Sequence, residues 1–200
     1  MDSIELFKKN KYVHVPQLIS EELTGFIYNY LVLKSCTNVD FSDGLQKQKD
    51  GFIRYCYADL NTETLSALLS NRLSQITQKK LCPTYSYVRV YTKGETLKPH
   101  FDRPSCQYSV TINFGGDPWP ISFGEFNKDK NLDDGYTLIN EITLKPGDGI
   151  VYMGEELVHW RNKFEGDHCA QAFLHYIDEE GPYHPEWAYD KRPNIGYKKF

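Results

Sequence analysis

Clusters of turn-forming residues divide the second half of this chain into short segments, and this feature most constrains the fold. The clusters lie at residues 115–118, 133–135 and 146–149, where Gly, Asp and Pro gather. Runs rich in aromatic and β-branched residues occupy 85–91, 107–114, 120–123, 137–144, 149–153 and 169–177. Short strands at nearly regular spacing, with no long helix between them, favour a sandwich or barrel over a parallel βαβ sheet. We therefore predict a β jelly roll over residues 83–177.

Helical patterns dominate the region before this jelly roll. A short strand at residues 11–16 precedes a helix that begins near Ser20, and a second helix is predicted over residues 62–79. The first helix is expected to pack with the face formed by Leu23, Phe26, Ile27 and Tyr30. The apolar stripe of the second is formed by Leu65, Leu68, Leu69, Leu73 and Ile76. Residues 37–55 are polar, and we interpret them as a loop and a candidate lid.

The chain length of 200 residues fits one domain. We expect a mainly β fold with N-terminal helices, in which residues 1–82 form a helical support and loop. Residues 83–177 form the jelly-roll core, and residues 178–200 form a C-terminal tail rich in Tyr, Pro and Lys. No internal repeat or linker divides the sequence further.

Composition and charge exclude several classes of function. A sequence that is 40% hydrophobic and 14% aromatic is not disordered, and a net charge of −4 argues against a nucleic-acid-binding protein. No segment approaches the roughly 20 apolar residues of a membrane span, and no signal peptide is recognised. The five cysteines form no CxxC pair. We therefore expect reduced thiols, no zinc cluster and a cytoplasmic protein.

The segment most informative about chemistry is residues 98–103. Residues i and i+2 of a strand face the same side, so His100 and Asp102 are expected to point together, and His159 is the candidate third ligand. Two imidazoles and one carboxylate, without a thiolate, suit a non-haem Fe(II) oxygenase better than a structural zinc site. An isolated HxD pair also occurs by chance, and a single later His is more often a surface or core residue.

Around these residues the sequence resembles a known family. Residues 91–102, YTKGETLKPHFD, resemble the first half of the metal motif of the Fe(II)- and 2-oxoglutarate-dependent oxygenases, closest to the prolyl-4-hydroxylase-like branch. Residues 144–152, followed by Val158 and His159, resemble the second half. Residues 12–20 resemble the way many members begin. The resemblance implies a double-stranded β-helix with Fe(II) held at its mouth by His100, Asp102 and His159.

The resemblance also implies a reaction. Fe(II), the cosubstrate 2-oxoglutarate and dioxygen are expected, with ascorbate as a further candidate cofactor, and the substrate is hydroxylated with release of succinate and CO2. The substrate is expected to be a peptide, a protein or a small molecule. A prolyl residue is expected if the likeness to the prolyl-hydroxylase branch extends to the substrate.

The sequence departs from the family where 2-oxoglutarate is normally anchored. An Arg or Lys is usual on the strand after the distal His, but residues 168–176 contain neither. Because a buried carboxylate needs a cationic or multiply donating partner, we expect Arg161 to bind it, with Arg89 as the second choice. Tyr91 resembles the family tyrosine whose hydroxyl contacts the oxoacid. Gln171 and His175 are further possible donors.

Two other functions fit the same strands. A cupin-type metalloenzyme would use the metal without 2-oxoglutarate, although cupin sites usually gather more histidines. A non-catalytic jelly-roll binding module would have no working metal site. Metal content separates the binding module from both enzymes.

Overall fold

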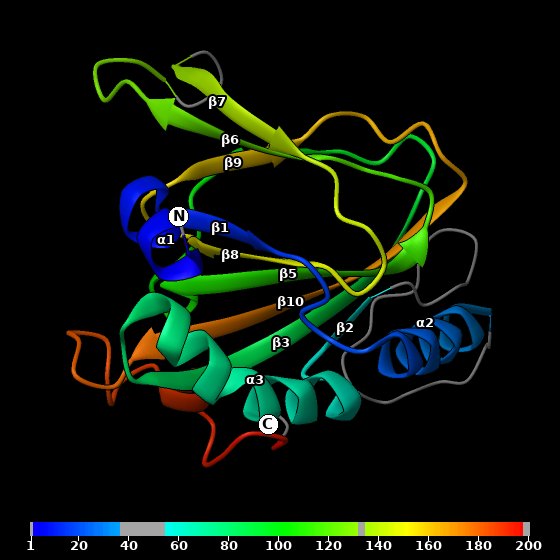
Figure 1. Ribbon diagram of the computed structural model, residues 1–200, viewed down its shortest axis with the longest axis horizontal. Coiled ribbons are helices and arrows are strands. Elements are labelled where there is room, and N and C mark those ends of the chain that lie inside the picture. Colours follow the sequence, from blue (N-terminus) through cyan, green and yellow to red (C-terminus); the bar gives the residue numbers. More distant parts are fainter. Residues whose placement is uncertain (1, 37–54, 132–134, 198–200) are drawn as a thin grey trace.

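The computed structural model describes residues 2–36, 55–131 and 135–197, whose strands form two antiparallel sheets (Figure 1). The larger sheet has the order β1-β8-β5-β10-β3-β2 and the smaller the order β4-β9-β6-β7. The strands are β1 (Tyr12–Val15), β2 (Tyr55–Tyr57), β3 (Leu81–Thr92), β4 (Leu97–His100), β5 (Tyr108–Gly116), β6 (Ile121–Phe126), β7 (Tyr136–Ile142), β8 (Gly149–Met153), β9 (Val158–Arg161) and β10 (His168–Asp178). This is the predicted double-stranded β-helix, or jelly roll.

The helices cover the face of the larger sheet that points away from the smaller one (Figure 1). They are α1 (Ser3–Asn10), α2 (Glu21–Cys36) and α3 (Leu60–Thr77), and two short 3-10 helices lie at Pro104–Cys106 and Ala188–Lys191. Phe7, Ile27 and Leu65 from the three helices pack in one buried cluster with Val88 and Leu174 of the sheet. No helix of the described residues is long and apolar enough to cross a membrane.

The two predicted helices are confirmed, but one residue of each predicted apolar face is exposed to solvent. Phe26 in α2 is 60% exposed and Leu68 in α3 is 69% exposed, so neither joins the core. Helical spacing places both residues near the apolar stripe, but the sheet covers only a narrower band of each helix. Helix α1 was not predicted from the sequence. Of the expected loop at residues 37–55, only Tyr55, the first residue of β2, lies within the described residues.

Alternation along the strands separates the packing face of the larger sheet from its inner face. In β3, Val88 and Val90 face the helices, whereas Tyr87, Arg89 and Tyr91 line a cavity between the two sheets. The same alternation in β10 turns alanines and Leu174 towards the helices. The period of two therefore turns one set of side chains towards the helices and the other towards the space between the sheets.

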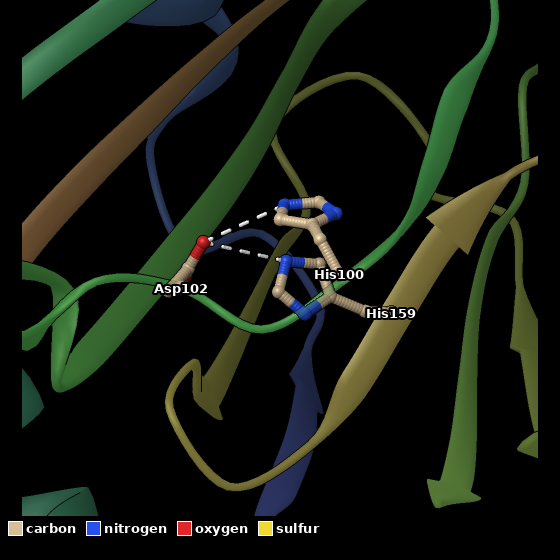
Figure 2. Close-up of side chains that lie close together, drawn as sticks. All are labelled: His100, Asp102 and His159. Atoms are coloured by element: carbon tan, nitrogen blue, oxygen red, sulfur yellow. Dashed lines mark ion pairs between the residues drawn. The ribbon is translucent and has the colours of Figure 1, made fainter. Parts of the chain in front are cut away.

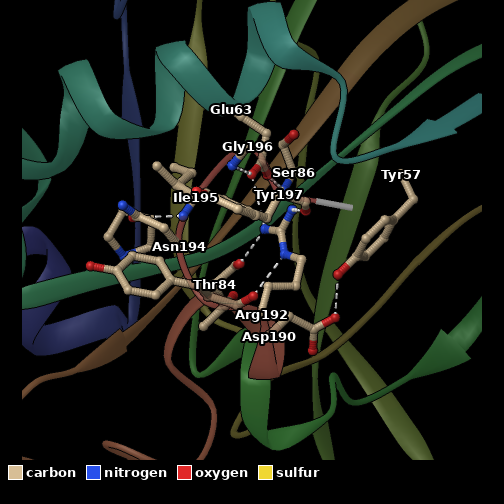
Figure 3. A network of polar contacts seen from close by, with 12 residues as sticks. Tyr57, Glu63, Thr84, Ser86, Asp190, Arg192, Asn194, Ile195, Gly196 and Tyr197 are labelled. Carbon is tan, nitrogen blue, oxygen red and sulfur yellow. Dashed lines mark hydrogen bonds and ion pairs between the residues drawn. The ribbon is translucent and has the colours of Figure 1, made fainter. Parts of the chain in front are cut away.

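A buried ion pair attaches the C-terminal tail to the support (Figure 3). The carboxylate of Glu63, in α3, accepts hydrogen bonds from Arg192 Nη2 at 2.9 Å and from the backbone N–H groups of Ser86 and Gly196 at 2.7 and 2.8 Å. Arg192 Nη2 also donates to the Thr84 carbonyl at 2.8 Å. The tail is thus held against α3 and β3 by groups that all have partners.

The turn before β8 depends on Asp148. Its carboxylate accepts hydrogen bonds from the backbone N–H of Gln17 at 3.0 Å, the backbone N–H of Lys145 at 3.1 Å and His14 Nε2 at 2.9 Å. Burial opposes the charge of this carboxylate, but the three hydrogen bonds outweigh burial and lower its pKa below the usual value. The side chain thereby ties β1 and the loop after it to the start of β8.

We predict that Asp148→Ala lowers the free energy of unfolding by about 3 kcal/mol at pH 7, because it removes three hydrogen bonds to a buried carboxylate that tie three segments together. The folded-state pKa lies below the unfolded value of about 3.9, so the stabilisation is present above that pH and is lost as pH falls through the folded pKa. Urea denaturation of both proteins between pH 7 and pH 3 measures this. An equal difference at both ends of the range would contradict the prediction. Asp167→Ala, at an exposed position, is the control.

Candidate metal centre and cavity

Three side chains, from two neighbouring strands and from the loop that follows the first of them, meet at one point (Figure 2). His100 ends β4 and pairs directly with His159 of β9 across the smaller sheet. Asp102 Oδ1 lies 3.6 Å from His100 Nε2 and 3.6 Å from His159 Nε2. The strand argument for Asp102 was wrong in detail, because β4 ends at His100 and Asp102 lies beyond it. The predicted grouping of the three residues nevertheless occurs.

Backbone hydrogen bonds fix which imidazole nitrogens face the centre. His100 Nδ1 lies 2.8 Å from the carbonyl oxygen of Lys98, and His159 Nδ1 lies 2.9 Å from that of Leu157. Because a carbonyl can only accept, each Nδ1 carries a proton, so Nε2 is the nitrogen of each ring that can present a lone pair to a metal. Such lone pairs, 3.6 Å from a carboxylate oxygen, repel it unless a proton or a metal cation lies between them. The donor set therefore fits a divalent metal with nitrogen and oxygen ligands.

The carboxylate of Asp102 is held in place from behind. Its Oδ2 accepts a hydrogen bond from Ser109 Oγ at 2.7 Å, and its backbone N–H donates to the Gly154 carbonyl at 2.9 Å. A Cβ atom on Gly154 would lie 2.1 Å from Oδ2, so only glycine leaves room for this carboxylate. Burial opposes the charge, but the two neighbouring imidazoles hold the pKa of Asp102 well below its usual range.

A cavity of about 290 Å³ opens beside these residues. Its remaining wall is largely aromatic and comes mainly from the inner faces of β3 and β10. Tyr85, Tyr87, Arg89, Tyr91, Leu97, Ile121, Tyr152, Phe173 and His175 complete the lining. A small ligand bound here would therefore contact both the three clustered side chains and a set of ring faces.

Arg161 is buried without an acidic partner. Its side chain is 1% exposed, Nη1 donates to the Trp119 carbonyl, and Nε and Nη2 have no hydrogen-bond partner among the described residues. Arg161 does not line the cavity itself, but its charge interacts with Tyr91 and Tyr152, which do. Burial lowers the pKa of this guanidinium. A buried cation with two unused donors favours the binding of an anion beside it.

Arg89 lines the cavity but is already paired. Its Nη2 forms an ion pair with Glu95, and its guanidinium lies 4.7 Å from the ring centre of Tyr91. Tyr91 is buried and meets Trp119 edge-on, and burial raises the pKa of its hydroxyl. Because Glu95 neutralises Arg89, the unpaired Arg161 is the better candidate for an anion partner.

Comparison with known proteins gives structural matches only. No family model matches the sequence, and no curated protein does. The epimerase SnoN from nogalamycin biosynthesis, in complex with Fe3+ and alpha ketoglutarate, matches with a TM-score of 0.63 at 12% identity, covering 97% of this chain and 90% of SnoN. EctD from S. alaskensis with 2-oxoglutarate matches with a TM-score of 0.66 at 15% identity, covering 96% of this chain and 83% of EctD. A Pseudomonas putida prolyl-4-hydroxylase matches with a TM-score of 0.60 at 13% identity, covering 88% of this chain and 97% of the hydroxylase.

This chain has the fold of the 2-oxoglutarate-dependent oxygenases. His100 and His159 lie on strands of the jelly roll and Asp102 lies just beyond the end of one of them. At these identities the likeness shows the oxygenase fold alone, so the roles of individual residues rest on the geometry described above.

Sequence analysis missed several residues of this oxygenase-fold cavity. Tyr85, Tyr87 and Tyr152 carry no motif, but the alternating pattern of β3 would have placed the first two beside Tyr91. Ser109 gave no signal, because its contact with Asp102 joins the start of β5 to a loop. His175 was considered only as a donor to 2-oxoglutarate, and its hydrogen bond to Ser109 could not be predicted from the sequence.

We predict that Asp102→Ala abolishes binding of Mn(II), used as a redox-stable probe, and that Ser109→Ala weakens it by about tenfold. Removing Asp102 deletes a ligand, whereas removing Ser109 only frees the carboxylate to rotate. Isothermal titration measures both affinities, and thermal denaturation checks that each variant is folded. Asp167→Ala is the matched control. Wild-type affinity in Asp102→Ala would exclude this residue as a ligand.

Proposed function

We propose that this protein is an Fe(II)- and 2-oxoglutarate-dependent oxygenase that hydroxylates its substrate. One observation carries the proposal: His100 Nε2 and His159 Nε2 both lie 3.6 Å from Asp102 Oδ1, at the wall of an aromatic cavity. Two imidazoles and a carboxylate on one side of a metal leave coordination positions open for other ligands. The fold shared with the solved oxygenases supports the same assignment.

Each residue of the site has a definite task in this proposal. His100, Asp102 and His159 hold Fe(II), which with 2-oxoglutarate and dioxygen supplies an oxidant for a substrate C–H bond, giving succinate and CO2. The backbone carbonyls of Lys98 and Leu157 keep both imidazoles in the metal-binding tautomer. The aromatic wall excludes water from the reacting centre.

Arg161 supplies the partner for the far carboxylate of 2-oxoglutarate. Its Nε and Nη2 are the unused donors of a buried cation, and a carboxylate accepts two parallel hydrogen bonds from such a group. Tyr91 lines the cavity and interacts electrostatically with the guanidinium, and we assign its hydroxyl the role of donating to the oxoacid. The basic residue that β10 lacks is thus replaced from β9.

Hydroxylation of a prolyl residue stays a prediction. The resemblance in sequence motivates it, and a prolyl-4-hydroxylase is among the solved structures that share the fold. The same set includes an epimerase, so the fold does not select the outcome or the substrate.

We predict that anaerobic addition of Fe(II) and then 2-oxoglutarate produces a visible metal-to-ligand charge-transfer band that saturates at one equivalent of each. The band requires both groups to be bound to the same centre, and it needs no knowledge of the substrate. Asp102→Ala should lose it. Bound iron without a band would favour the cupin-type enzyme, and no bound iron would favour the binding module.

We predict that Arg161→Ala weakens 2-oxoglutarate binding to the Fe(II)-loaded protein by roughly thirty- to one-hundredfold, as expected for the loss of a buried charged hydrogen-bonding partner. Fe(II) affinity should change less than threefold. Titration of the charge-transfer band gives the first quantity, and an iron titration gives the second. Arg161→Lys, which keeps the charge but not the fork of donors, should fall between the two. A larger effect of Arg89→Ala would transfer the role to Arg89.

A further inference from the structure

The hydroxyl of Ser109 determines the protonation pattern of a second residue. Ser109 Oγ lies 2.7 Å from Asp102 Oδ2, 2.9 Å from His175 Nδ1 and 3.2 Å from the carbonyl oxygen of Cys106. A carboxylate and a carbonyl can only accept, and a hydroxyl has one proton to give. Since that proton is taken by the charged carboxylate, His175 Nδ1 must carry its own proton and donate it to Ser109 Oγ.

This tautomer leaves His175 with a lone pair on Nε2. The side chain is only 6% exposed and lines the cavity together with the three clustered residues. Nε2 has no hydrogen-bond partner among the described residues. The ring packs against Tyr85, with their centres 4.6 Å apart, so it cannot turn freely to exchange the two nitrogens. Burial lowers the pKa of His175 to about 4, which keeps the imidazole neutral.

The neighbouring thiol does not make this a second metal site. Ligand atoms of Asp102, Cys106 and His175 lie within 4.8 Å of one another. However, the Nδ1 of His175 is occupied by its bond to Ser109, and burial raises the pKa of the Cys106 thiol to about 12. A protonated thiol and a protonated Nδ1 offer no lone pair suited to a metal. The Nε2 lone pair of His175 is therefore free for a ligand of another kind.

We propose that His175 is a specificity-determining residue whose Nε2 accepts a hydrogen bond from an O–H or N–H group of the substrate. The substrate is then a molecule with an apolar body that fits the aromatic wall and a hydrogen-bond donor beside the carbon to be oxidised. A site built around a buried acceptor discriminates strongly against analogues without the donor, because their binding leaves the acceptor unpaired. That the molecule bound here is a substrate rests on the proposed oxygenase function. That His175 Nε2 is a hydrogen-bond acceptor does not rest on it.

The first test determines the tautomer directly. Protein with 15N-labelled histidine rings is loaded with Zn(II), and long-range 1H–15N correlations identify which ring nitrogen of each histidine is protonated. The signals of His175 are assigned by their absence in His175→Asn. We expect a proton on Nδ1 and none on Nε2. A proton on Nε2 would overturn the proposal.

The second test uses phenol and anisole as probes, which differ in the presence of one O–H donor. We expect the Zn(II)-loaded protein to bind phenol about fivefold more tightly than anisole, the size of effect expected from one neutral hydrogen bond. Phenol should also shift the His175 Nε2 resonance. Equal binding of the two probes, or no shift of that resonance, would overturn the proposal.

A matched pair of variants separates the two nitrogens of His175. Asn places an amide near the position of Nδ1 and can still donate to Ser109, but it has no distal acceptor. Gln places its carbonyl oxygen near the position of Nε2. We expect the preference for phenol to vanish in His175→Asn and to persist in His175→Gln, with Zn(II) affinity unchanged in His175→Asn. A preference that survives in His175→Asn contradicts the assignment.

Neither test uses iron or 2-oxoglutarate. A missing charge-transfer band would therefore contradict the oxygenase function, and the tautomer of His175 and its binding of phenol could still be measured. A failed probe experiment beside a normal band would contradict the role of His175 alone.

Discussion

The approach of one carboxylate oxygen to two imidazole lone pairs is the contact on which the rest of the site depends. Asp102 Oδ1 lies 3.6 Å from both Nε2 atoms, which face it because each Nδ1 donates to a backbone carbonyl. Such an arrangement needs a proton or a metal cation between the three groups, and the surroundings reinforce it. Gly154 leaves room for the carboxylate, Ser109 fixes its second oxygen, and the pairing of β4 with β9 sets the distance between the imidazoles. The fold thus maintains a set of acceptors that a divalent metal would satisfy.

The larger sheet supports this centre by keeping its two faces chemically separate. Val88 and Leu174 turn outward into the cluster beneath the helices, while their neighbours Tyr87 and His175 turn inward to the cavity. The side chains that line the cavity therefore come from the opposite face of the sheet to those that pack against the helices. The tail adds to the same support, because Arg192 pairs with Glu63 behind β3 rather than within the cavity (Figure 3).

The sequence predicts the strands, the jelly roll and the grouping of His100, Asp102 and His159, because turn residues and alternation are local signals and the HxD motif is short. It does not predict which residues meet across long separations. Phe26 and Leu68 fit a helical stripe, but burial depends on how much of each helix the sheet covers. The contact between Ser109 and His175 joins residues that no periodicity links. Arg161 was chosen for its position beside His159, but its lack of an acidic partner is visible only in three dimensions.

Arg161, which does not line the cavity, and His175, which does, differ in the kind of ligand that each favours. Arg161 is a buried cation with unused donors, so it attracts a carboxylate. The lone pair on His175 Nε2, fixed by the bond to Ser109, repels a carboxylate and accepts a donor. An oxoacid placed against His175 would set lone pair against negative charge, and a neutral alcohol or amide placed against Arg161 would leave the buried charge uncompensated. The hydrogen bond that orients Asp102 for the metal therefore also determines, through one shared hydroxyl, where the cosubstrate does not bind.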